Sequence, residues 1–448
     1  MSDTVAAIAT ANAPGGIGIV RVSGPAAFGI AKKIFRPKNS LDWDNIRGYR
    51  MVYGALEDID EAICLFFREP GSYTGEDVVE FQCHGGPLLL QRVLRAVLDA
   101  GARMAGPGEF TRRAWLNGRI GLHQAEAVMR LVNAQSEQAL RAAHAGMGAA
   151  LTERIAAIRE KLTALAAHIA AWTDYPEEDI SPLRDGEAEG VLQEAGEALT
   201  GLIGRSKGAR AVLEGVSAAL VGRPNVGKSS LLNRLAGYER AIVTPLPGTT
   251  RDTVTETVQL GNLTLRLTDT AGLRKTDHPV EKAGVERSEA AMKSADLVLI
   301  VVDACEGITG ENKALLEQCD LERTIVVANK IDLVALERPE AVPYKHVVYT
   351  SAVTGEGLDA LARAAQAICQ TAGFVPGEAM LATQRQAQCA ADARNAVVEA
   401  LGALRDGFAP DAVSVCLEAA VQALFSLTGE RASDAVVEEV FKSFCVGK

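Results

Sequence analysis

The chain has 448 residues, of which 48% are hydrophobic and 23% charged, a composition typical of a globular protein with about three domains. Its net charge of −11 argues against a generally basic nucleic-acid-binding surface, so any RNA contact needs a local basic patch or a partner protein. No uninterrupted apolar run reaches the ~20 residues that span a bilayer, so we expect a cytoplasmic protein without membrane contact.

The first segment combines strand and helix patterns. We expect strands near residues 5–10, 18–22, 62–67 and 78–83, and a helix over 88–100, with glycines at the turns. This predicts an N-terminal α/β domain over residues 1–118.

Helical patterns flank the middle of the chain. No proline occurs from Gly121 to Tyr175, and further helices are expected over 187–204, 378–408 and 411–426. Strand patterns occupy the segment between these helices. We therefore expect a compact domain, residues 212–374, inserted into an all-α domain formed by residues 119–211 and 375–448.

A phosphate-binding loop is the most informative motif. The run Gly222 to Ser230 reads GRPNVGKSS and directly follows an apolar strand pattern over 216–221. In a strand–GxxxxGK[ST]–helix arrangement, glycines let backbone amides surround phosphates, Lys228 reaches the outer phosphates and Ser229 can bind Mg²⁺. The segment is therefore predicted to be a Ras-like P-loop G domain.

Three later motifs, in the expected order, specify the nucleotide. Asp269 to Gly272 (DTAG) supplies a carboxylate for the magnesium shell and an amide near the terminal phosphate. Asn329 to Asp332 (NKID) follows an apolar strand pattern, and its carboxylate can accept the two hydrogen bonds that guanine donates and adenine cannot. Ser351 and Ala352 would complete a guanine pocket with backbone amides, so GTP is the predicted ligand.

The polar loop Pro247 to Asp252 is a switch candidate, with Thr250 as a second hydroxyl ligand for Mg²⁺. Leucine stands at position 273, where signalling GTPases commonly place the glutamine that orients water. Either GTP hydrolysis by this protein is very slow, or another group positions the water, for which Arg274, Glu281 and Glu286 are nearby candidates. A bound monovalent cation, with Asn225 as an oxygen ligand, could replace an arginine finger.

The sequence stops at Phe444 to Lys448, reading FCVGK. Glycine and lysine after Cys445 fit prenylation poorly, and a thiolate there would be a nucleophile only beside a cation. The eight cysteines are scattered without a Cys-x-x-Cys pair, which favours reduced thiols over a disulfide or zinc framework. From sequence alone, Cys445 is either incidental or reactive.

Taken together, these motifs resemble the MnmE (TrmE) family of tRNA modification GTPases. The resemblance rests on the nucleotide motifs, Leu273, the helical flanks and the FCVGK ending. It also rests on four N-terminal stretches: PGGIGIVRVSG at 14–24, YTGEDVVE at 73–80, HGGP at 84–87 and PGEF at 107–110.

The resemblance implies an N-terminal domain that binds a tetrahydrofolate derivative, in its 5,10-methylene or 5-formyl form, and that forms a homodimer. Arg21, Glu80, Arg119 and Lys448 would contact the folate, with Arg119 standing where a lysine is common. Cys445 would lie near the folate as a candidate catalytic nucleophile.

The resemblance also implies a flavoprotein partner, MnmG, in a heterotetramer. Together they would add an aminomethyl-type or carboxymethylaminomethyl group to C5 of the wobble uridine of certain tRNAs. In the G domain, K⁺ would be held by Asn225, Thr244, Leu246 and Thr249, and Glu281 would orient water. From its position alone, Glu281 could also be an exposed carboxylate at a helix start.

The complete set of predicted GTP contacts is Asn225, Val226, Gly227, Lys228, Ser229, Ser230, Thr244, Thr249, Thr250, Asp269, Thr270, Ala271, Gly272, Asn329, Lys330, Asp332, Ser351 and Ala352. Two other classes of function fit the G motifs alone. A ribosome-assembly or regulatory GTPase would leave the N- and C-terminal motifs unexplained. A membrane-remodelling GTPase would need a basic amphipathic helix, which the sequence does not display.

Overall fold

The computed structural model describes residues 3–174, 186–238, 255–261, 263–269, 292–334, 344–371, 375, 377–442 and 444–447. The chain divides into two compact units. The first joins the residues up to Met129 with those from Thr428 onward, and the second comprises Arg130–Leu427. The three boundaries expected from sequence, after residues 118, 211 and 374, remain predictions.

The first unit is built on a seven-stranded sheet in the order β3-β4-β5-β6-β2-β1-β7, antiparallel except for the β1–β7 pair. The strands are β1 (Val5–Ile8), β2 (Gly15–Ser23), β3 (Phe35–Pro37), β4 (Arg50–Leu56), β5 (Asp60–Phe67), β6 (Val78–Gly85) and β7 (Arg103–Met104). The four strands expected from sequence are confirmed as β1, β2, β5 and β6. The short strands β3 and β7 and the strand β4 were not expected.

Two helices, α1 (Ala27–Ile34) and α2 (Pro87–Asp99), contribute to one core with alternate residues of the sheet. Val20 and Val22 of β2 belong to this core, so Arg21 between them points to the opposite face. Phe110 of α3 (Glu109–Leu116) packs with Val5 and Ala7 of β1 in a separate cluster. The two faces of the sheet therefore differ: one packs on α1 and α2, and the other carries polar residues beside α3.

The carboxyl-terminal segment completes the first unit. Helix α14 (Asp434–Lys442) packs Val437 and Phe441 against Leu122, the first residue of α4 (Leu122–Asn133). Phe444 belongs to the same cluster, and the Phe441 and Phe444 rings lie 5.1 Å apart. Residues about 300 positions apart in the chain thus form one core, which fixes where the tail begins.

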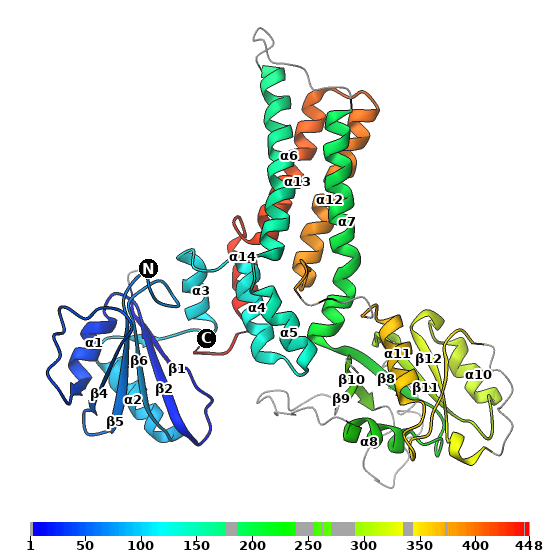
Figure 1. Cartoon of the computed structure of the whole chain (residues 1–448), viewed down its shortest axis with the longest axis horizontal. Helices are drawn as coiled ribbons and strands as arrows, with labels where there is room; N and C mark the ends of the chain where they lie inside the picture. Colours follow the sequence, from blue (N-terminus) through cyan, green and yellow to red (C-terminus); the bar gives the residue numbers. More distant parts are fainter. Residues whose placement is uncertain are drawn as a thin grey trace. The chain divides into compact units, whose positions relative to one another are not determined.

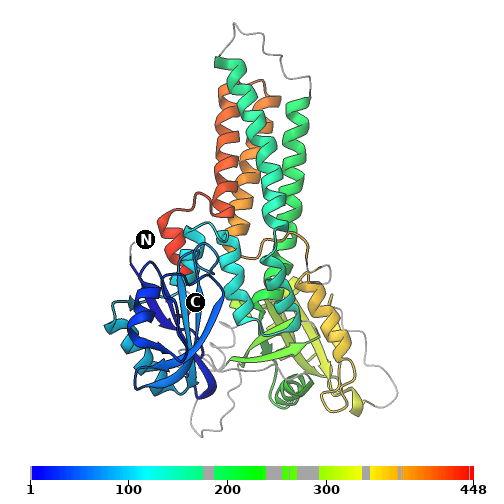
Figure 2. The same cartoon turned by 60° about the vertical axis from the view of Figure 1, so that its left-hand side comes forward.

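In the second unit, four long helices run side by side in both views (Figures 1 and 2). They are α6 (Ala150–Asp174), α7 (Glu187–Glu214), α12 (Gln384–Arg405) and α13 (Pro410–Thr428), and α5 (Glu137–Gly146) precedes them. Ile155, Leu162 and Ile169 of α6 are buried in the bundle core. Among the described residues, α13 alone is long and apolar enough to cross a membrane, but 39% of its apolar window is buried, and Leu417 and Leu424 belong to the bundle core.

The second unit also contains a six-stranded sheet in the order β13-β12-β11-β8-β10-β9, parallel except for β9. Its elements are β8 (Val216–Val221), α8 (Lys228–Tyr238), β9 (Thr255–Leu260), β10 (Leu263–Asp269), β11 (Leu297–Asp303), α10 (Gly310–Glu317), η1 (Leu321–Arg323), β12 (Thr324–Asn329), η2 (Ile331–Leu333), β13 (Val347–Tyr349) and α11 (Leu358–Ile368). This is the Ras-like α/β architecture expected for a P-loop domain.

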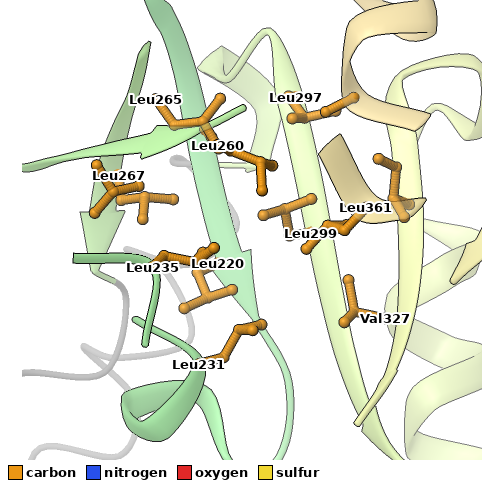
Figure 3. Close-up of a cluster of buried hydrophobic side chains, with 14 of the residues drawn as sticks. Leu220, Leu231, Leu235, Leu260, Leu265, Leu267, Leu297, Leu299, Val327 and Leu361 are labelled. Atoms are coloured by element: carbon orange, nitrogen blue, oxygen red, sulfur yellow. The ribbon is translucent and has the colours of Figure 1, made fainter. Parts of the chain in front are cut away.

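Both faces of this sheet are covered. On one face, Leu231 and Leu235 of α8 and Leu361 of α11 pack against Leu220 and Leu299 of the central strands (Figure 3). On the other face, alternate strand residues pack with Leu316 of α10. Burying one such leucine stabilises the fold by roughly 1.5–3 kcal/mol. The central strands are therefore apolar on both sides, and polar residues gather where the strands end.

Candidate functional site: a nucleotide edge and a seated tail

Four of the predicted motifs lie at one edge of the parallel sheet. Strand β8 leads into the phosphate loop, β10 ends at Asp269, β12 ends at Asn329 and β13 is followed shortly by Ser351. Asp269 pairs in register with Leu220. Because carboxyl ends of parallel strands share an edge, the tertiary structure brings these motifs together there.

Positive backbone φ angles shape the phosphate loop. Asn225 has φ 65° and Gly227 φ 96°. A Cβ on Gly227 would lie 2.3 Å from Nδ2 of Asn329, and a Cβ on Gly222 would lie 2.3 Å from the carbonyl oxygen of Val301. Only glycine fits at these two positions, so the loop passes close to the neighbouring strands and leaves its amides for a ligand.

Lys228 begins α8 with its ammonium beside the loop. Its Nζ donates 2.6 Å hydrogen bonds to the carbonyl oxygens of Gly222 and Arg223, which places a positive charge at the loop. Ser229 and Ser230 are exposed in the first helical turn. Since a helix N-terminus favours anions, this arrangement suits a polyphosphate with its metal ion.

Asn329 connects three parts of the site. Its buried side chain donates from Nδ2 to the carbonyl oxygen of Val226 at 3.0 Å, and its Oδ1 accepts from the backbone amide of Ala352 at 3.0 Å. Ser351 and Ala352 are themselves buried. Asn329 therefore sets the spacing between the phosphate loop and the loop predicted to hold guanine.

Lys330 and Asp332 of the NKID motif differ in their surroundings. Lys330 has φ 69° and pairs through Nζ with Oδ2 of Asp303 at 2.7 Å. This hydrogen bond raises the pKa of Lys330; burial alone would raise the pKa of Asp303, but the contact with Lys330 holds it below its usual value. Asp332 lies exposed in η2, with its carboxylate available to a ligand. Asp303 was not identified from sequence. Its position at the end of the apolar strand β11, beside the NKID strand, could have indicated it.

Several predicted residues lie outside the described part of the chain, and so do Leu273, Arg274 and Glu286. For Asp269, the structure describes the backbone only. The predicted site residues outside the described ranges are Thr244, Leu246, Thr249, Thr250, Thr270, Ala271, Gly272, Glu281 and Lys448.

In the first unit, the structure brings together two of the predicted folate contacts. Nε of Arg21 donates to Oε1 of Glu80 at 2.7 Å, across paired positions of β2 and β6. The Arg21 guanidinium also lies 5.5 Å from the ring centre of Phe110 in α3. The two side chains thus form a charged pair on the face of the sheet beside α3.

Arg119 follows α3 and lies against the loop that contains the YTGE motif. A Cβ on Gly75 would be 3.2 Å from Cγ of Arg119, and the Asn117 side chain donates to the carbonyl oxygen of Thr74 at 2.7 Å. Tyr73 is hydrogen-bonded through its hydroxyl to Thr111 at 2.9 Å, and burial raises the Tyr73 pKa. Tyr73 belongs to the YTGEDVVE motif, but only the tertiary structure places it beside α3.

Residues 445–447, called the tail here, are held by backbone contacts within the first unit. The Gly108 amide donates to the carbonyl oxygen of Cys445 at 3.3 Å, and Val446 forms an antiparallel bridge with Pro107. Gly447 has φ 99°, and a Cβ there would lie 2.2 Å from the carbonyl oxygen of Ile8. The Cys445 thiol is exposed. Gly447 thus lies against Ile8, one position along β1 from Ala7, which pairs with Arg21 in the sheet.

A buried ion cluster, not expected from sequence, holds α3 in place. Arg113 is fully buried and contacts Asp3 at 2.8 Å and both Glu76 and Glu109 at 3.0 Å. Hydrogen bonds from Arg103 lower the pKa of Asp3, and they also lower that of Glu109 although burial opposes this. Because a buried charge is costly without partners, the cluster fixes α3 and the Gly108 turn on which the tail rests.

Comparisons with known proteins agree with this architecture. The family model described as "MnmE helical domain" matches residues 122–445, and the model "GTP-binding protein TrmE N-terminus" matches residues 4–119. The tRNA modification GTPase MnmE of Symbiobacterium thermophilum is 46% identical over 458 residues, covering 100% of this chain and 99% of that protein. The protein of the same description from Thermus thermophilus is 44% identical and is covered completely, as is this chain.

Among solved structures, the G domain of the T. maritima FeoB iron transporter is 32% identical. The alignment covers 35% of this chain and 99% of that chain, with a TM-score of 0.25.

Proposed function

The chain belongs to the MnmE family of tRNA modification GTPases, and on this premise we propose that it modifies carbon 5 of the wobble uridine of certain tRNAs together with a flavoprotein partner, MnmG. It is a GTP-hydrolysing enzyme of tRNA modification. The added group is an aminomethyl or carboxymethylaminomethyl group. The observation that carries the proposal is the contact of residues 445–447 with Gly108, Pro107 and Ile8, because Ile8 follows Ala7, which pairs with Arg21 in the sheet.

A tetrahydrofolate derivative supplies the one-carbon unit in this proposal. Arg21 and Glu80 offer a donor and an acceptor for a pterin, and Arg119 and Lys448 offer cations for acidic groups of the folate. Cys445 has an exposed thiol near this site and is the candidate nucleophile.

GTP would be held by the 18 predicted contacts given above, and the geometry of the phosphate loop, Lys228 and Asn329 supports that assignment. Mg²⁺ would be held by Ser229 and Thr250, and it neutralises charge on the phosphates. K⁺ would be held by Asn225, Thr244, Leu246 and Thr249, supplying positive charge where this chain offers no evident arginine finger. Glu281 would orient the attacking water in place of the missing glutamine.

The proposed assembly is a cytoplasmic homodimer that joins MnmG in a heterotetramer and binds tRNA without membrane contact. GTP hydrolysis would drive a conformational change, since one-carbon transfer to uridine needs no phosphoryl chemistry. A ribosome-assembly or regulatory GTPase is the alternative, but such a switch gives the seated tail no role.

Nucleoside analysis of bulk tRNA tests the proposal. A strain lacking this protein is expected to have unmodified wobble uridines, and wild-type protein is expected to restore them. The Cys445→Ser variant would lack the proposed nucleophile, and Asp269→Ala would lack a magnesium-shell carboxylate, so both are expected to fail. Wobble uridines that are modified as in wild type in the deletion strain would exclude the proposed role in wobble-uridine modification.

Potassium dependence tests the cation proposal. We expect GTP hydrolysis to be about tenfold or more faster in potassium than in sodium at equal ionic strength, because a positive charge at the phosphates stabilises the transition state. Asn225→Gly keeps the φ of 65° accessible while removing the side-chain ligand, so it should lose this response. The exposed Asn233 of α8 gives the control, Asn233→Ala. Equal wild-type rates in both salts contradict the proposal.

A further inference from the structure

Arg234 of α8 reaches from the phosphate-loop helix to the loop that follows β13. Its Nη2 donates to the carbonyl oxygen of Thr354 at 2.9 Å. Its Nε is buried and makes no hydrogen bond within the described part of the chain. No nucleotide motif includes Arg234, and the function assigned above makes no use of it.

The guanidinium lies directly on the backbone of Gly355. A Cβ built on this glycine would lie 2.7 Å from Nη2, 3.3 Å from Nε and 3.4 Å from Cζ of Arg234. Gly355 also has φ 86°, a conformation that favours glycine. The absence of a side chain at position 355 therefore leaves room for the planar group to pack there.

Hydrogen bonds transmit the position of this turn to Ser351 and Ala352. The Thr354 amide donates to Oγ of Ser351 at 3.1 Å, and the Gly355 amide donates to the Ser351 carbonyl oxygen at 2.8 Å. The Ser351 amide in turn donates to the carbonyl oxygen of Glu356 at 3.0 Å. Displacing Thr354 or Gly355 would therefore move the residues predicted to face guanine.

The loop is thus tied to the phosphate-loop segment at two points. Asn329 links the Ala352 amide to the Val226 carbonyl on one side, and Arg234 links the Thr354 carbonyl to α8 on the other. Val226 precedes Lys228 and Arg234 follows it. Both contacts end within residues 226–234. They therefore hold the loop 351–357 and the phosphate loop 222–230 at a fixed spacing.

We propose that Arg234 is a positioning residue of the guanine pocket, which holds residues 351–357 in the nucleotide-binding arrangement and slows nucleotide release. The inference rests on the guanine site assigned above. Without the Arg234 contact, the loop must be ordered when nucleotide binds, and that ordering reduces affinity. Arg234 touches neither the phosphates nor the hydrolytic water in this assignment, so its loss is expected to act on nucleotide binding and release and not on the chemical step.

The test measures release of a ribose-labelled fluorescent GDP from the full-length protein. Arg234→Ala is expected to release GDP about fivefold faster, the scale of one lost charge-assisted hydrogen bond partly transmitted to the ligand. Arg234→Lys keeps one cationic donor and should give an intermediate rate. The matched control is Arg363→Ala, which removes an exposed arginine from α11. Arg363→Ala is expected to keep the wild-type values of both GDP release and kcat at saturating GTP in potassium.

A second readout separates positioning of the loop from damage to the Asp332 side of the pocket. Guanine and hypoxanthine share the C6 oxygen and the N1–H, whereas only guanine has the exocyclic amine from which Asp332 would accept a second hydrogen bond. Arg234→Ala should therefore weaken the binding of GDP and of inosine diphosphate (IDP) by the same factor. The ratio of their dissociation constants should stay unchanged. A changed ratio, or release no faster than in Arg363→Ala, overturns the inference. Failure of the guanine site itself would show differently, as an unchanged base preference in Asp332→Asn.

Discussion

Asp332→Asn is expected to transfer the nucleotide preference of this enzyme from GTP to xanthosine triphosphate. Asp332 lies exposed in η2 directly after β12, where its carboxylate can accept from the N1–H and the amine of guanine. Xanthine has an oxygen in place of that amine, so an asparagine amide can donate to it. Sites that bind through matched hydrogen bonds reject mismatched partners strongly, and we expect the ratio of kcat/KM values to change by about 10³.

The control for this change is Asp359→Asn, which neutralises an exposed carboxylate in the first turn of α11. It has the same effect on net charge and should leave the base preference as it is. The measurement is GTP and xanthosine triphosphate hydrolysis by each purified variant. A preference for GTP that survives in Asp332→Asn would show that the base pocket is misassigned.

Gly447→Val is expected to abolish tRNA modification while leaving basal GTP hydrolysis within about twofold of wild type, since the two sites use different residues. Gly447 has φ 99°, and even a Cβ would lie 2.2 Å from a backbone oxygen of Ile8. A backbone contact cannot yield as a flexible side chain can, so the tail must leave its place. The proposed folate site then loses Lys448 and the ordered position of Cys445. We expect binding of 5-formyltetrahydrofolate to weaken by about tenfold or more.

Val446→Ala is the matched control, because Val446 is 52% exposed and its bridge to Pro107 is made by the backbone. It should retain both folate binding and tRNA modification. Wild-type folate affinity in Gly447→Val would contradict the proposed role of the tail. A loss of GTP hydrolysis in the same variant would instead show that the two activities are not separable.

Regular elements were largely predictable because local periodicity and turn residues encode them. Strand β8 and the long helices α6, α7, α12 and α13 follow apolar patterns of the expected spacing, and the structure confirms them. Their lengths were less predictable: α7 extends to Glu214, ten residues beyond the expected end, because packing can stabilise a helix beyond the limit suggested by its sequence pattern. The segment 121–175 was expected as long helices, and its described part forms α4, α5 and α6.

The sequence by itself determined the phosphate loop, the NKID motif and the nucleotide class, because each is a contiguous backbone feature whose chemistry depends on neighbouring residues. Only the tertiary structure decided how these motifs are spaced. The ties made by Asn329 and Arg234, the buried Arg113 cluster and the seating of the tail on Pro107 and Gly108 each join residues remote in the chain. Such contacts depend on long-range packing and on hydrogen bonds that satisfy buried groups, and neither leaves a local periodicity in the sequence.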